Sequence, residues 1–115
     1  MMKENEIATL IEWGKEEKQS EFVDFVNFCV ECRANRKIII VEMDGEIREL
    51  PLEFFSFDYR KPFDDFDFII FPSDFRNNIR LLYTSMNLIK KIGENIYHVE
   101  TTKGKSAIIR LKEGQ

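Results

Sequence analysis

The sequence predicts an α+β fold: a two-layer sandwich in which helices cover an antiparallel or mixed sheet of about five strands. Three observations predict it. The first 33 residues carry apolar side chains at helical spacing, a β-branched run followed by Asp44-Gly45 is typical of a hairpin, and a second hairpin pattern ends the sequence. The predicted order is α-α-β-β-β-α-β-β, and 115 residues fit a single domain over residues 1–115.

Two helices are expected first. The helix over residues 4–18 has apolar positions on one face: Ile7, Leu10, Ile11 and Gly14. Ser20 is the expected N-cap of the helix over residues 21–33, which is apolar around most of its circumference: Phe22, Val23, Phe25, Val26, Phe28, Cys29 and Val30. We expect this second helix to lie at the centre of the core or to be covered on its outer side by a partner.

The strands are expected next. Residues 36–43 form a β-branched run, Asp44-Gly45 is a strong hairpin turn signal, and residues 46–52 return. Pro51 places that return strand at an edge of the sheet or at its end. Residues 53–62 read either as a short extended piece or as a loop anchored by phenylalanines, and residues 66–71 read as a strand that Pro72 stops.

The rest of the chain predicts a third helix and a hairpin. Ser73 or Asp74 would cap a helix that runs to about Lys91 and ends at Gly93. Its apolar face would be Phe75, Ile79, Leu82, Met86 and Ile89. Residues 94–111 then form a hairpin that turns at Lys103-Gly104.

Composition indicates an ordinary globular protein. It is 43% hydrophobic and 33% charged, and its 11 phenylalanines predict a Phe-rich core. The first 20 residues contain no uninterrupted apolar run and two cysteines are too few for a disulfide framework, so we expect a soluble, cytoplasmic protein. Many Lys, Glu and Ile with only two Gln are typical of a thermophile or a thermophile virus.

Charge is divided unevenly along the chain. Residues 1–73 hold 9 Lys/Arg and 17 Asp/Glu, whereas residues 74–115 hold 8 and 4. A basic second part can attract an anionic partner, or the two parts can pair with each other in the fold. The second interpretation is favoured.

The segment 63–71, FDDFDFIIF, suggests two roles for its aspartates. In a strand, Asp65 and Asp67 share a face and could bind Mg²⁺ with Asp58 or Asp74 as a third ligand, which would indicate a metal-dependent hydrolase or nuclease. Charge at the entry of an apolar strand also blocks edge-to-edge pairing. This gatekeeping role is favoured, and no metal or other cofactor is expected.

Other familiar motifs are incomplete. Cys29 and Cys32 form a CxxC near the end of a helix, where the dipole does not favour a thiolate, so buried thiols are favoured over a zinc or redox site. Gly104-Lys105-Ser106 resembles the end of a P-loop, but Val99 stands where that pattern needs glycine. No nucleophile lies near His98 in the sequence, so no catalytic residue is assigned.

The leading hypothesis is a small non-enzymatic protein that acts through protein–protein contacts, as a homodimer or as a subunit or modulator of a larger assembly. The candidate interaction residues are aromatic: Trp13, Phe28, Phe57 and Tyr59. The alternative is a nucleic-acid-binding module that uses the basic residues of the predicted third helix and last hairpin: Arg76, Arg80, Lys90, Lys91, Lys103 and Lys105. No membrane partner is expected.

Overall fold

A computed structural model describes residues 2–60, 65–72 and 77–115 and confirms the α+β class. Within these described residues, two N-terminal helices precede seven antiparallel strands, which form one sheet in the order β2-β1-β7-β6-β5-β4-β3. The elements are α1 (Glu4–Glu16), α2 (Ser20–Ala34), β1 (Ile38–Met43), β2 (Glu46–Pro51), β3 (Phe54–Tyr59), β4 (Phe66–Phe71), β5 (Ile79–Gly93), β6 (Ile96–Thr101) and β7 (Ser106–Leu111).

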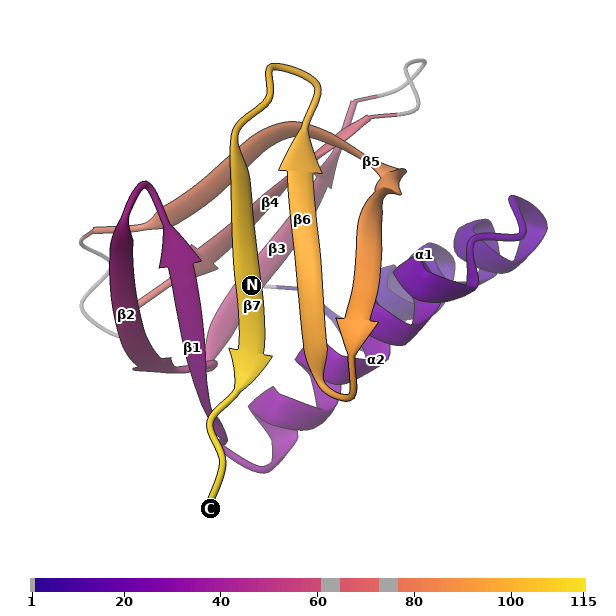
Figure 1. Ribbon diagram of the computed structural model, residues 1–115. Coiled ribbons are helices and arrows are strands. Elements are labelled where there is room, and N and C mark those ends of the chain that lie inside the picture. The colour runs from indigo at the N-terminus through magenta and orange to yellow at the C-terminus, as the bar shows by residue number, and fades with distance from the viewer. Residues whose placement is uncertain (1, 61–64, 73–76) are drawn as a thin grey trace.

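The sheet is strongly curled. Figure 1 shows β2, β1, β7 and β6 in front and β4 and β3 behind them, with β5 bending from one group to the other. The first part of β5 pairs with β4 and its last part pairs with β6. The two helices lie against the sheet, and α2 contacts β5.

The β1–β2 hairpin forms as predicted. Asp44 and Gly45 have φ angles of 55° and 75°, the positive values that a two-residue type I′ turn requires at both central positions. Pro51 ends β2, and β2 is an edge strand of the sheet. The β6–β7 hairpin also turns at Lys103-Gly104, where Gly104 has a φ of 85°.

The core is built from phenylalanines of α2, β3 and β4. The rings of Phe22 and Phe25 lie 5.5 and 5.2 Å from those of Phe66 and Phe68, and Phe57 is 4.8 Å from Phe68. Such tilted and edge-to-face contacts add to the burial of the rings themselves. The broad apolar surface of α2 is thus covered by α1 and the sheet of the same chain.

Polar contacts fix α2 on β5 and β6. The Asp24 carboxylate accepts hydrogen bonds from the Lys91 ammonium at 2.7 Å and from the Tyr97 hydroxyl at 3.2 Å. The Glu21 carboxylate accepts the Lys91 backbone N–H at 2.5 Å. Mainly because of the Lys91 hydrogen bond, the pKa of Asp24 is lowered from its ordinary value.

The predicted third helix is wrong, because Ile79–Gly93 is the 15-residue strand β5. Its buried side chains are Ile79, Leu81, Thr84, Met86 and Ile89, at successive spacings of two and three residues. The pairing register shifts with β4 next to Thr84 and again with β6 between Thr84 and Ile89. An extra residue at a bulge increases the distance between successive inward side chains from two residues to three. The average spacing then approaches that of a helix, which explains the error.

The predicted number of strands and the predicted order of elements along the chain are therefore wrong as well. The ambiguous segment 53–62 contains β3, and the supposed third helix is β5, so the sheet has seven strands instead of about five. The predicted cap at Ser73 or Asp74 lies outside the described residues. In the described part of the chain, no helix has both the length and the apolar character that crossing a bilayer requires.

Candidate functional site

The four aromatic residues predicted to bind a partner lie mainly inside the protein. Phe28 and Phe57 are buried, and Trp13 and Tyr59 are half-buried. The Trp13 ring contacts those of Tyr59 at 4.7 Å and Phe22 at 6.3 Å. Contacts within the chain bury the other two rings, because Phe28 packs against Tyr97 at 5.1 Å and Phe57 packs against Phe68 at 4.8 Å.

The two candidate metal ligands have different surroundings. Asp67 forms an ion pair with Arg60, and its other oxygen accepts the Tyr83 backbone N–H at 2.9 Å. Asp65 has one buried oxygen with no hydrogen-bond partner among the described residues. The described residues contain no group of three or more acidic, His or Cys side chains that could hold a metal ion, and Asp74 lies outside them. Asp67 instead fixes the bulge of β5 against β4.

The cysteines are buried free thiols, as favoured from the sequence. Burial raises the pKa of Cys29 well above its usual range and raises the pKa of Cys32 to about 11. Both thiols are therefore neutral near pH 7, which disfavours nucleophilic or redox chemistry. His98 is half-buried on β6 and pairs across the sheet with Ile108 and Lys90.

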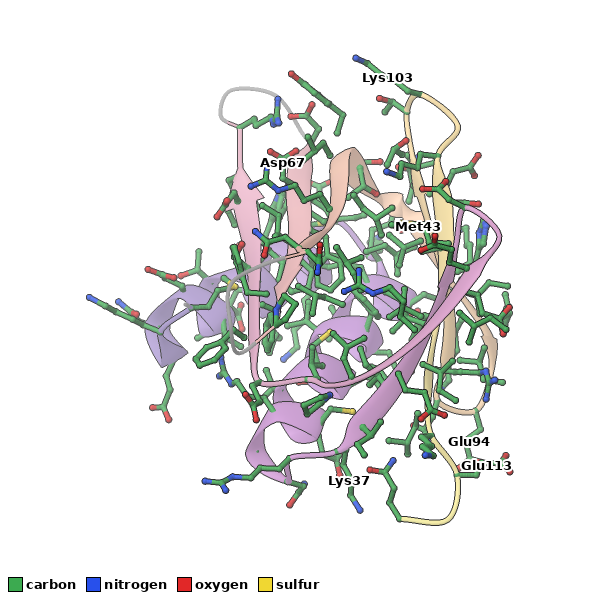
Figure 2. All side chains as sticks on the ribbon, turned by 90° about the vertical axis from the view of Figure 1, so that its left-hand side faces the viewer. Lys37, Met43, Asp67, Glu94, Lys103 and Glu113 are labelled. Atoms are coloured by element: carbon green, nitrogen blue, oxygen red, sulfur yellow. The ribbon has the colours of Figure 1, made fainter. Side chains whose placement is uncertain are left out.

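The basic residues of the alternative hypothesis are dispersed. Arg76 lies outside the described residues, and Arg80 is exposed on β5. Lys90 and Lys91 lie near the turn between β5 and β6, whereas Lys103 projects from the β6–β7 turn at the other end of the strands (Figure 2). Lys91 pairs with Asp24, and Lys105 pairs with Asp44 at 3.7 Å. One continuous basic surface does not result.

One small cluster combines cations and an aromatic ring. The Arg60 guanidinium lies 3.6 Å from the centre of the Tyr83 ring, and the Lys103 ammonium lies 5.1 Å from it. Tyr83 has a φ of 63°, an unfavourable conformation for a residue with a bulky side chain. Its carbonyl accepts the Thr102 N–H at 2.9 Å, so the β6–β7 turn and the β5 bulge support each other.

The two edges of the sheet differ in accessibility. At β3, Phe55 is 0% exposed and Phe57 is 2% exposed, main chain included. The Arg33 guanidinium lies 4.8 Å from the Phe55 ring centre and donates a hydrogen bond to the Met2 carbonyl at 3.5 Å. The start of the chain and the end of α2 therefore cover this edge, as natural sheets require of an apolar edge strand.

The other edge, β2, is open. Ile47 is 68% exposed, more than any other large apolar side chain among the described residues. In a two-residue hairpin the residues that flank the turn, Met43 and Glu46, form a hydrogen-bonded pair. The alternation of the ladder then directs the N–H and C=O of Ile47 and Glu49 away from β1. No described residue makes a backbone hydrogen bond to these four groups.

A shallow depression of about 390 Å³ adjoins this edge. Its lining comes from the β1–β2 hairpin, β6 and β7: Glu42, Met43, Asp44, Gly45, Glu46, Ile47, His98, Ser106, Ala107 and Ile108. Two of its carboxylates face cations of β7 or the preceding turn, Glu42 with Arg110 at 3.7 Å and Asp44 with Lys105 at 3.7 Å. The surface beside Ile47 is thus part apolar and part ionic.

Sequence reasoning missed Ile47, although it correctly placed β2 at an edge through Pro51. The usable signal was an isoleucine two residues after the predicted Asp44-Gly45 hairpin turn, on that edge strand. No protein-family model matches this chain, and neither a curated protein nor a solved structure shows significant similarity to it. The candidate site therefore rests on geometry alone.

Proposed function

We propose that this protein acts through protein–protein contacts, either with a second copy or as a subunit or modulator of a larger assembly. The contact site in this proposal is the open edge β2. The observation that carries it is the coincidence at Ile47 of a side chain that is 68% exposed and main-chain groups without a partner in the described residues. Edge strands in this condition accept another strand readily.

The state of the other candidate groups supports contact over catalysis. Asp67 is held by Arg60 and the Tyr83 N–H, and the two cysteines are buried with raised pKa values. A group that takes part in a reaction needs access to a substrate and a pKa suited to proton transfer or attack. These three residues are better suited to holding the fold.

The proposal is tested by capture with three immobilised proteins: the wild type, Ile47→Lys and Ile92→Lys. Ile92 is the matched control, because it is an exposed isoleucine (55%) on a different strand, β5. We expect one protein, which can be a second copy, to bind the wild type and the control but not Ile47→Lys. Equal retention by all three, or retention by none, contradicts the proposal.

Nucleic-acid binding is the second candidate, and the cluster of Arg60, Lys103 and Tyr83 favours it. Cations beside an exposed aromatic ring are suited to single-stranded nucleic acid. If Lys103 and Lys105 contact the phosphates of a single strand, replacing both by Ala lowers the log–log salt slope of binding by about 1.4, whereas the same two contacts on a duplex would lower it by about 2. Filter binding at several salt concentrations tests this, and weak binding that is indifferent to both lysines removes the candidate.

A further inference from the structure

We propose that a second copy of this chain pairs with β2 in an antiparallel ladder, with Ile47 opposite Ile47 of the second copy. This inference rests on the proposed function, because it specifies the partner of the same edge. The two sheets would then continue into each other across a two-fold axis. Figure 2 looks toward this side of the molecule, with the hairpin that carries Met43 in front.

Along β2, residues whose main-chain N–H and C=O point toward β1 alternate with residues whose groups point away from it, and this alternation limits the possible registers of the pairing. Only Ile47 and Glu49 direct both N–H and C=O outward, because Pro51 has no N–H and its carbonyl accepts the Glu53 N–H at 3.1 Å. An antiparallel, two-fold pairing must bring outward residues of both copies face to face. The centre of symmetry can therefore lie at Ile47, Arg48 or Glu49.

Charge selects among these three registers. Centred on Arg48, the ladder places two arginines opposite each other, and centred on Glu49 it does the same with two glutamates. Centred on Ile47, it places Glu46 opposite Arg48 of the second copy, and the symmetry repeats this pair. Opposite charges across a pair of strands are favourable, and like charges directly opposite are unfavourable. The register centred on Ile47 also joins the two exposed isoleucines.

Arg48 is already positioned to pair with Glu46 of the second copy. Its guanidinium donates a hydrogen bond to the Asn77 carbonyl at 2.9 Å, which holds the side chain on the inner side of β2. Glu46 lies two residues away and is exposed. Because a guanidinium carries five N–H donors, Arg48 can keep the Asn77 bond and still meet a carboxylate of the second copy. A contact made by one short strand from each copy is small, and small interfaces of this kind form weak, concentration-dependent dimers.

Single cysteines along β2 distinguish the registers. In the proposed register two copies of Ile47→Cys have Cα atoms about 5.5 Å apart, within the range of a disulfide. The Cα atoms of two Arg48→Cys copies would be roughly 8 Å apart and those of two Glu49→Cys copies roughly 14 Å apart, which is too far. The native Cys29 and Cys32 are buried and do not compete.

Under mild oxidation we expect Ile47→Cys to form a disulfide-linked dimer at least 10-fold faster than Arg48→Cys or Glu49→Cys. Fastest linking at position 48 or 49, or equal slow linking at all three, overturns the register. Exchanging the charges at positions 46 and 48 in the Ile47→Cys variant tests the register a second time. Glu46→Arg or Arg48→Glu alone should slow linking, and the two together should restore it, with melting curves confirming that each variant is folded.

The mass of the wild type separates the two proposals. Sedimentation equilibrium should show a dimer that grows with concentration, whereas Ile47→Lys remains a monomer. A wild type that stays monomeric at the highest concentrations, with no linking at position 47, overturns the second copy as the partner. If Ile47→Lys nevertheless loses a different captured protein, the proposed function stands without this inference; if it loses none, both fail.

Discussion

Both edge strands of the sheet turn main-chain N–H and C=O groups away from the sheet, and the fold treats these two strands in opposite ways. β3 is the apolar edge, FFSFDY, and it is covered by Met2 and Arg33. β2 is the charged edge, EIRELP, and it remains open apart from the bond between Arg48 and Asn77. The comparison teaches that hydrophobic sequence alone does not mark a contact surface, because the more apolar edge is the one that the fold encloses.

The largest expected difference between the edges is in stability. Phe55→Ala removes a fully buried ring of β3 and should lower the free energy of unfolding by about 3–5 kcal/mol. Ile47→Ala on β2 should change it by no more than about 0.5 kcal/mol at a concentration where the protein is monomeric. Urea denaturation measures both, and similar losses at the two positions would contradict the assignment of the edges.

Opening the covered edge should have a smaller effect on stability and a visible effect on solubility. Arg33→Ala removes the cation–π contact with Phe55 and the hydrogen bond to Met2, a loss of about 1–2 kcal/mol. The uncovered apolar strand should also promote aggregation, which light scattering detects. Lys15→Ala, at an exposed position of α1, is the control. If both variants stay equally soluble, Arg33 is not a cover.

The far end of β3 depends on Asp67, which pairs with Arg60 next to the strand. Asp67→Asn should lower the melting temperature because the ion pair is lost and the Tyr83 N–H retains only a neutral acceptor. Mg²⁺ should leave the melting temperature of the wild type unchanged. A saturable rise with Mg²⁺ that disappears in Asp67→Asn would restore the metal-site hypothesis.

The smallest effect concerns the attachment of α2, which carries Arg33 to the covered edge. The pKa of Asp24 is lowered in the folded protein, so its contribution to stability is complete above its ordinary value of 3.8 and is lost as the pH falls through the folded-state pKa. Asp24→Asn should therefore be slightly less stable than the wild type at pH 7, and the difference should vanish in acid. A pH-independent difference would contradict this assignment.

The local elements could be predicted where one signal dominated. The type I′ turn at Asp44-Gly45, the edge position of β2 and the helical spacing of α1 each depend on residues close together in the sequence. β5 could not be predicted in this way, because its bulges depend on register with β4 and β6. The candidate site could not be predicted because the sequence does not show which edge side chains the fold buries: Phe57 is buried and Ile47 is exposed.

The central claim, an open edge at β2 and a closed edge at β3, is tested most directly by amide hydrogen exchange. The N–H groups of Ile47 and Glu49 point away from β1, and the same alternation turns those of Phe55 and Phe57 away from β4. At low protein concentration we expect Ile47 and Glu49 to exchange at nearly unprotected rates, whereas burial makes Phe55 and Phe57 slow. Equal protection at the two edges, or faster exchange at Phe55 and Phe57, would contradict the account.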